Sequence, residues 1–205
     1  MSFATPVWDQ TIFEFFHYTR NQAFDFLAPL FSSPVFLWGV VLVGLFFGLR
    51  GWPRRHQVLV VLSLLALLGM ADGGTNIVKN QVGRVRPLNA LASVYFHEDG
   101  KWQQRPADFV QTKEKGSSFP SAHAANSMGV AVLLAFFFPA CRKSIWLFPV
   151  LVGWSRFYLA KHYPIDVCSG WIFGAVMAAI ICAVLLSLCS RSIKEIRWRQ
   201  NGRLQ

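Results

Sequence analysis

Acidic residues are scarce in this chain: Asp and Glu number ten among 205 residues, against twenty Lys and Arg. The acids form no cluster of the kind that holds a pair of metal ions, which argues against a dinuclear metal centre. The cysteines lack the spacing of a metal site, and small buried apolar side chains explain them best: Cys141, Cys168, Cys182 and Cys189. We therefore expect neither a metal nor another cofactor.

Charges of either sign are missing from long stretches, and hydrophobic residues make up 54% of the chain. Uncharged blocks cover 26–49, 57–71, 124–141 and 167–190, with a shorter one at 144–155. A bilayer crossing needs about 20 mostly apolar residues, so the longer blocks fit membrane spans. The shorter ones require a polar end inside a cavity lined by protein. A removable signal peptide is not expected, because the first block begins well into the chain and lacks a cleavage site.

We predict an all-α, multi-pass transmembrane bundle that forms a single domain over residues 1–205. Its five clear spans are expected at 34–49, 57–79, 120–139, 144–159 and 167–190. Residues 8–30 predict an amphipathic helix that lies at the interface or packs on the bundle, with a sixth span as the alternative. Four of its aromatic and apolar side chains share one helical stripe: Trp8, Ile12, Phe15 and Phe16.

The net charge of +10 is concentrated in three basic segments, around residues 50–55, at 142–143 and in the tail 191–205. The positive-inside rule places all three on the cytoplasmic side. The charge is therefore a topology signal, with anionic-lipid contact by the tail as an addition, and nucleic-acid binding is not expected. The polar segment 80–118 then forms a long non-cytoplasmic loop, and loops of that length are functional or disordered.

Three polar motifs fall on that non-cytoplasmic side. The first reads KNQVGRVRP, in which Lys79 and Arg86 lie two helical turns apart and Pro87 turns the chain outward. The second reads SFPSAHAAN, in which Ser118 or Ser121 caps a helix and His123 occupies its first turn. Such a helix start is an anion site. Each motif alone also has a purely structural explanation. The cations of the first could extend to the membrane interface, and the serine of the second could simply cap a helix beside an incidental histidine.

The third motif reads SRFYLAKHYPIDV and contains Arg156, His162 and Asp166. Pro164 breaks the helix, so His162 and Asp166 meet across a turn. A carboxylate bonded to one ring nitrogen fixes the tautomer and leaves the other nitrogen as a nucleophile. The alternative gives Asp166 a capping role and His162 a place on the surface. Lys161 is expected to be a solvated charge.

Together the motifs supply cations, two imidazoles and one carboxylate at the ends of three different spans. Phosphoryl transfer needs this inventory: cations to hold the equatorial oxygens, an in-line nucleophile, and an acid for the leaving oxygen. Fixed cations would take the place of metal ions.

The motifs closely resemble the signature of the type 2 phosphatidic acid phosphatase family, K-x6-R-P, P-S-G-H and S-R-x5-H-x3-D. They occur in the right order, and the sole departure is Ala122 in place of Gly. The resemblance implies that His162 attacks phosphorus to form a phosphohistidine, that Asp166 orients it, and that His123 protonates the leaving oxygen. It also implies a phosphate site without metal, built from Lys79, Arg86, Ser121 and Arg156.

Two further groups are candidates for supporting roles. Asp72, Asn76 and Lys79 share one face of the second predicted span, and Asp72 is expected to support Lys79. In the long loop, headgroup recognition and simple packing are equally good explanations for four side chains: Tyr95, Phe96, His97 and Trp102.

The resemblance implies a membrane lipid phosphatase whose partners are the bilayer and a phospholipid or isoprenoid-phosphate substrate. Undecaprenyl diphosphate, phosphatidylglycerophosphate, phosphatidic acid and lipid A phosphates are the candidates, and the small, bacterial-like chain favours the first by a narrow margin. The expected location is the bacterial inner membrane, with the site on the periplasmic or extracellular face. A lipid-to-lipid phosphotransferase and, further off, a transporter or channel are the alternatives. The oligomeric state is open.

Overall fold

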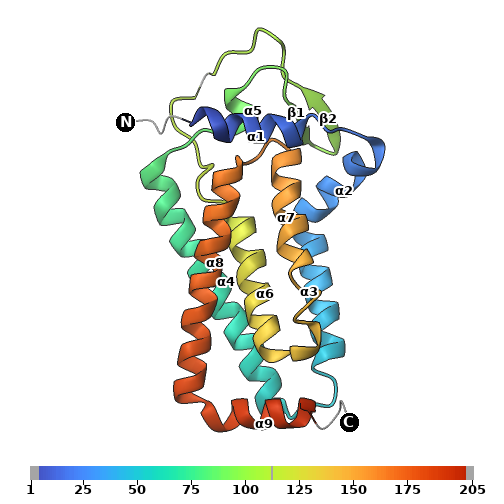
Figure 1. The fold of residues 1–205 in the computed structure, drawn as a ribbon, viewed down its shortest axis with the longest axis vertical. Helices are drawn as coiled ribbons and strands as arrows, with labels where there is room; N and C mark the ends of the chain where they lie inside the picture. Colours follow the sequence, from blue (N-terminus) through green and yellow to red (C-terminus); the bar gives the residue numbers. More distant parts are fainter. Residues whose placement is uncertain (1–4, 112, 202–205) are drawn as a thin grey trace.

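Helices α3 (Pro34–Gly48), α4 (Arg54–Val82), α6 (Ala122–Phe137), α7 (Leu147–Tyr158) and α8 (Pro164–Leu188) run along the long axis of the computed structural model (Figure 1). Shorter elements gather at its ends: α1 (Val7–His17), α2 (Gln22–Ser32), α5 (Pro87–Ala90), β1 (Tyr95–Glu98), β2 (Lys101–Gln104), a 3-10 helix (Pro139–Cys141) and α9 (Ser190–Asn201). The structure describes residues 5–111 and 113–201. Residues 1–4, Thr112 in the predicted loop and residues 202–205 of the predicted tail lie outside these ranges.

Helix α6 occupies the middle of the bundle, where it packs against α4, α7 and most closely against α8. Small residues permit this approach. A Cβ built on Gly174 would lie 1.9 Å from the Ala125 carbonyl oxygen, and one on Gly170 would lie 2.4 Å from that of Ser121. In a membrane, burial of apolar surface contributes little to helix association, and close backbone contact of this kind stabilises the helix pair instead. The α6–α8 contact therefore fixes the start of α6 against the start of α8.

The expectation of an all-α protein is wrong in one place, because residues 95–104 form a two-stranded antiparallel hairpin. Tyr95 pairs with Gln104, and Glu98 pairs with Lys101. Asp99 and Gly100, between the strands, have φ values of +49° and +76°. An Asp-Gly pair is the sequence that adopts this left-handed geometry most readily in a tight hairpin. The predicted loop is thus partly regular structure.

The expectation of five full spans is not confirmed. Among the described residues, two segments are long and apolar enough to cross a bilayer, Arg54–Ala90 and Pro164–Leu188. The bent pair α2 and α3, with 71° between its parts, would make a third. Helix α6 is apolar but has 16 residues, and α7 has 12. At about 1.5 Å per residue, α7 extends little more than half of the hydrocarbon core. The uncharged block 124–141 is longer than α6 because it includes the 3-10 turn, and the span predicted at 144–159 includes three residues that precede α7.

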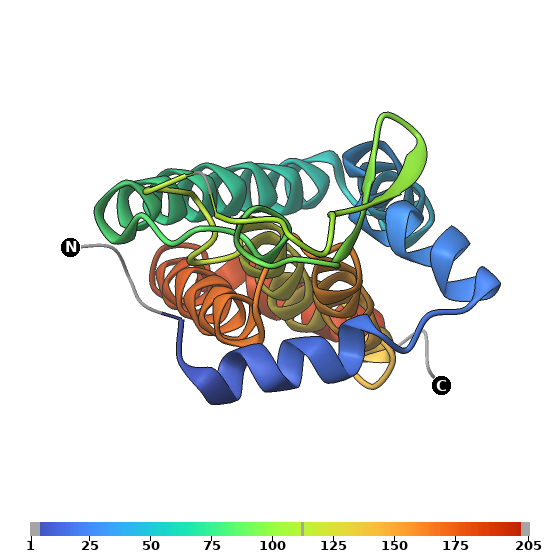
Figure 2. The ribbon, with the colours of Figure 1, turned by 90° about the horizontal axis from the view of Figure 1, so that it is seen from above.

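The segment 8–30, predicted as one amphipathic helix, is divided between α1 and α2. Asn21 caps α2 by accepting a hydrogen bond from the Phe24 N–H at 2.9 Å. Helix α1 lies across the ends of α7 and α8 (Figures 1 and 2). Its buried face carries Asp9, Phe13 and His17, and the predicted aromatic stripe points outward, with Phe15 70% exposed. Helix α1 therefore presents apolar side chains to its surroundings and buries polar ones.

The described parts of the basic segments, residues 50–55, 142–143 and 191–201, lie at the opposite end of the bundle from α1 and the hairpin (Figure 1). Helix α9 returns to the start of α4, where Arg55 pairs with Glu195. Ile193 and Ile196 of α9 are buried in the core formed by α4, α6 and α8. The two ends of the molecule therefore differ in charge, as the positive-inside pattern requires.

The close contact of α6 and α8 can be tested with Gly174→Ala. The added methyl group meets the Ala125 backbone, which cannot move without shifting α6, so we expect a loss of about 1–3 kcal/mol of stability. Thermal unfolding in detergent measures the change. Gly69→Ala is the control, because a Cβ there has no atom within 4 Å. Equal unfolding temperatures for both variants would contradict the packing argument.

Candidate active site

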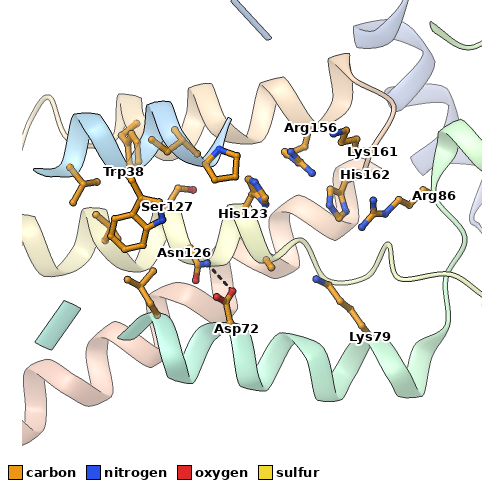
Figure 3. Close-up of a pocket in the computed structure, with 17 residues that line it drawn as sticks. Trp38, Asp72, Lys79, Arg86, His123, Asn126, Ser127, Arg156, Lys161 and His162 are labelled. Atoms are coloured by element: carbon orange, nitrogen blue, oxygen red, sulfur yellow. Dashed lines mark hydrogen bonds between the residues drawn. The ribbon is translucent and has the colours of Figure 1, made fainter. Parts of the chain in front are cut away.

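A cavity of about 540 Å³ opens among α3, α4, α6, α7 and the α7–α8 connection (Figure 3). Its polar part is lined by two imidazoles and four cations: His123, His162, Lys79, Arg86, Arg156 and Lys161. Its other part is largely apolar and is lined by Leu37, Trp38, Val41, Leu68, Val130 and Phe148. A cationic head and an apolar tail in one cavity match the two halves of an anionic amphiphile.

The structure brings the three predicted motifs together at this cavity. Lys79 and Arg86 come from the end of α4 and the segment after it, His123 from the first turn of α6, and Arg156 and His162 from α7 and its connection to α8. The predicted supporting residue Asn76 is exposed and does not line the cavity.

Ser121 is the N-cap of α6 and is fully buried behind the cavity. Its hydroxyl accepts a hydrogen bond from the Ala124 N–H, and its own N–H donates to the Asp166 carbonyl at 2.9 Å. The Ser121 amide is therefore already engaged within the protein. The next residues, Ala122 and His123, do line the cavity and present the positive end of α6 to it.

His162 is 2% exposed, and its ring is held from behind. Nδ1 lies 2.7 Å from the Ser118 carbonyl oxygen and 3.7 Å from Oδ2 of Asp166. A carbonyl oxygen can only accept, so Nδ1 carries the proton and Nε2 keeps its lone pair. The direct contact that fixes this tautomer is thus the backbone carbonyl of Ser118. The Asp166 carboxylate, which was expected to fix it, lies farther from Nδ1.

Asp166, the third residue of α8, is fully buried and saturated with hydrogen bonds. Its Oδ1 accepts from Arg84 at 2.6 Å, and its Oδ2 accepts from the Ser118 hydroxyl at 2.6 Å and the Tyr163 N–H at 2.9 Å. These contacts fix the same Ser118 whose carbonyl holds the ring of His162. Asp166 therefore positions the imidazole mainly through Ser118.

Arg84 links this carboxylate to the N-terminal helix. Its second terminal nitrogen donates to Oδ2 of Asp9 at 2.6 Å, and the guanidinium lies 4.1 Å from the centre of the Tyr163 ring. Asp9 also accepts from the Ile165 N–H at 2.9 Å. The side chains of Arg84, Asp9 and Asp166 have no exposed surface. Sequence reasoning missed Arg84 and Asp9, although an acid on the buried face of α1 and a second arginine beside Arg86 were visible in the sequence.

The cations of the cavity lack enough acidic partners to neutralise them. Arg156 donates to the Ser32 hydroxyl, and Arg86 donates to that of Ser117 at 3.4 Å. The Nε atoms of both arginines are buried, and neither has a hydrogen-bond partner within the described part of the chain. Buried donors without partners are costly, and a cleft of one sign concentrates counter-ions. The arrangement is suited to hold an anion with several oxygens.

Lys161 was expected to be a solvated charge, but the structure places it in the cavity lining. Burial lowers the pKa of its ammonium group, and the nearby cations Arg156 and Arg86 lower it further. The turn that brings Lys161 inward has Ala160 at φ +52°. Lys161 therefore adds a fourth cation to the three that the motifs predicted.

Burial also lowers the pKa of His162 to about 4, opposed by the nearby Asp166 carboxylate and assisted by the charge of Arg156. The imidazole is therefore neutral at pH 7. A neutral ring with its Nε2 lone pair facing a cationic cavity can attack an electrophilic centre such as phosphorus.

Comparison with known families agrees with this geometry. The family model described as the PAP2 superfamily matches residues 58–188, which include all three motifs. The chain belongs to the PAP2 superfamily. Among its PAP2 relatives is the lipid A 4'-phosphatase of Bacteroides thetaiotaomicron, 27% identical over 81% of this chain and 72% of that protein. Another is the undecaprenyl-diphosphatase of Sulfolobus acidocaldarius, 28% identical over 60% of this chain and 52% of that protein.

A similar fold is found in the crystal structure of Aquifex aeolicus LpxE. It aligns with a TM-score of 0.66 over 89% of this chain and 99% of that chain, at 20% identity. This likeness concerns the fold alone. Several of the curated relatives are longer, and the chain spans about half of their length.

The buried ion network can be tested with Arg84→Gln, which leaves Asp9 and Asp166 without their cation. Breaking a buried pair costs about 3–5 kcal/mol, so we expect a much lower unfolding temperature in detergent. Arg55→Gln removes an arginine from an exposed pair, where the expected loss is below about 1 kcal/mol. If the two variants lose the same stability, the network does not have the structural role assigned to it.

Proposed function

We propose that this PAP2-type membrane phosphatase removes a phosphate group from a lipid through a phosphohistidine on His162. The observation that carries the proposal is the neutral His162, held with Nε2 unprotonated in the same cavity as His123 and four cations. A phosphoryl group needs a nucleophile, an acid on the opposite side, and positive charge around its equatorial oxygens.

In the proposed reaction, Nε2 of His162 attacks phosphorus, and the bond between phosphorus and the leaving oxygen breaks. His123, protonated beside the bound phosphate anion, donates a proton to that oxygen, so the leaving group departs in its protonated form. Water then loses a proton to the now neutral His123 and attacks the phosphohistidine, which releases inorganic phosphate and restores neutral His162 and protonated His123. Asp166, 3.7 Å from Nδ1, stabilises the positive charge on the phosphorylated ring.

The cations hold the phosphate oxygens in this proposal. Arg86 and Arg156 offer buried Nε donors without protein partners in the described residues, and Lys79 and Lys161 add charge from two sides. The first-turn amides of α6, placed by the Ser121 cap, face the same region. Ser121 thus contributes by positioning the helix end, and Ala122 in place of Gly leaves that end open to an anion.

A lipid substrate is supported by the apolar part of the cavity, which follows α3, α4 and α6 away from the cations. Related proteins are named for lipid A phosphates and undecaprenyl diphosphate. We infer that the site faces away from the cytosol of a bacterial cell, because the basic segments lie at the other end of the bundle (Figure 1). The outward-facing aromatic stripe of α1 then lies in the outer interface.

The decisive test is phosphate release by purified protein from a panel of lipid phosphates in detergent. His162→Gln should abolish release, since the glutamine amide cannot form the phosphoenzyme. With radiolabelled substrate, wild-type protein quenched in alkali should carry label that the variant lacks. His97→Gln is a matched control, because His97 lies on the hairpin outside the cavity lining and should leave activity intact. Label recovered in a lipid acceptor instead of free phosphate would identify a phosphotransferase.

The pH dependence follows from the state of His162. Protonation of Nε2 removes the nucleophile, so activity is present above the His162 pKa and lost as the pH falls through it. With that pKa lowered to about 4, the acid limb of log(kcat/KM) should lie near pH 4 instead of near the ordinary histidine value of about 6.5. A steady-state pH profile measures it. An acid limb near 6.5 would show that the ring is not desolvated as described.

A further inference from the structure

An acid lines this cationic cavity on the apolar segment Arg54–Ala90, where its side chain is exposed. Asp72 of α4 is the one Asp or Glu in the cavity lining among the residues that the structure describes. Its Oδ1 accepts a hydrogen bond from the Asn126 side chain of α6 at 2.9 Å (Figure 3). Carboxylates inside a membrane are costly and mark functional sites by default. The proposed phosphate chemistry does not use this one.

Asn126 gives the pair a further hydrogen-bond acceptor. Its Oδ1 is buried and has no hydrogen-bond partner in the described residues. Because Nδ2 donates to Asp72, the pair offers the cavity the remaining carboxylate lone pairs and an amide oxygen, all of them acceptors. Oxygens of this kind bind hydroxyl and amide N–H groups and repel anions.

The position of Asn126 along α6 indicates which part of a substrate would contact the pair. Asn126 follows His123 by three residues, so it lies on the same helix face about 4.5 Å deeper. Beyond the pair the wall becomes apolar, with Leu68 and Val130. In the proposed reaction His123 protonates the leaving oxygen. The first atoms of the leaving group then pass Asp72 and Asn126 before the lipid chain reaches the apolar wall.

We propose that Asp72 and Asn126 form a specificity site that binds a hydroxyl or amide donor on the leaving alcohol and disfavours a second phosphate there. The inference rests on the proposed function and narrows its substrate class. The preferred substrates are phosphomonoesters of sugar or glycerol headgroups. A diphosphate would place its inner phosphate against the Asp72 carboxylate, so the narrow preference for undecaprenyl diphosphate drawn from the sequence is reversed.

A competing role for Asp72 is electrostatic support of Lys79, which lies on the same face of α4 two turns later. The two roles differ in what they affect. Support of Lys79 acts on the reacting phosphate, which every substrate carries, so its loss would slow all substrates alike. Recognition of the leaving group alters the ratio between substrates that differ only beyond the phosphate.

The experiment compares two matched lipid pairs. Monooleoylglycerol phosphate has a free hydroxyl beside the phosphoester, and oleoyl propanediol phosphate lacks it. Farnesyl phosphate and farnesyl diphosphate share one chain and differ by the second phosphate. Wild-type protein should prefer the hydroxyl-bearing lipid by about tenfold in kcat/KM, the discrimination expected of a hydrogen bond to a charged group.

Asp72→Leu should bring the hydroxyl preference close to one and raise the ratio of diphosphate to monophosphate hydrolysis about tenfold. Asp72→Asn, which keeps the shape and removes the charge, should move the diphosphate ratio in the same direction. Asn76→Leu, one turn later on the same helix and outside the cavity lining, is the control and should leave both ratios unchanged. Slower hydrolysis with unchanged ratios in the Asp72 variants would overturn the inference alone. Wild-type protein that releases phosphate from none of the four lipids would overturn the proposed function and the inference with it.

Discussion

The geometry of this site depends on one buried arginine placed between two buried carboxylates. Arg84 holds Asp9 of α1 and Asp166 of α8, at 2.6 Å each, in a region without solvent. Removing three charges from water is expensive, and their attraction compensates only when the remaining lone pairs are also satisfied. Here they are, through the Ile165 and Tyr163 N–H groups and the Ser118 hydroxyl. The cost of loosening any one member keeps three distant segments together.

The consequence for chemistry runs through Asp166. The same carboxylate caps α8, pairs with Arg84 and fixes Ser118, and the Ser118 carbonyl then fixes the tautomer of His162. In the proposed reaction, an imidazole held in this way needs no reorganisation before it attacks phosphorus. Because α1 is part of the network through Asp9, the helix whose aromatic face is exposed is also joined to the site by hydrogen bonds. This link explains why α1 buries an aspartate and exposes Phe15.

Much of the site could be predicted from the sequence, because its residues come in short motifs with fixed spacing. Lys79 and Arg86 lie in one such motif, and His162 lies in another. Counting the predicted spans from the basic turns placed the three motifs at helix ends on the same side of the bundle. Arg84 and Asp9 could not be paired in this way, since they are 75 residues apart and have no recognisable spacing. The Ser118 contact to His162 is made by a backbone carbonyl. Every residue has one, so the amino-acid sequence does not predict this contact. Lys161 was misjudged because the turn at Ala160 directs it inward.

The fold was predicted less completely, for a physical reason that differs between elements. Composition shows where charge is absent, but it does not show where a helix begins or ends, so α7 is shorter than the span predicted at 144–159 and lies three residues later than the uncharged block 144–155. The hairpin had a visible signal in Asp99 and Gly100, which the surrounding polar residues obscured. Helix α1 carries an amphipathic pattern whose polar side is the buried one. A prediction from the hydrophobicity pattern assumes that polar residues are exposed to water. That assumption fails for α1, because Asp9 belongs to a buried ion network.

The order of side chains along the cavity is itself an argument about the substrate. The cations and the two imidazoles gather at one end of the cavity, Asp72 with Asn126 lies beyond His123, and an apolar wall follows (Figure 3). A simple alkyl or prenyl phosphate has no group to match the Asp72–Asn126 pair, so it would place hydrocarbon against a carboxylate, which is unfavourable. A headgroup with hydroxyl or amide donors between phosphate and chain matches every layer. Asn126 donates one hydrogen bond to the Asp72 carboxylate, and under the proposed specificity a donor-bearing headgroup would provide the next one when the cavity fills.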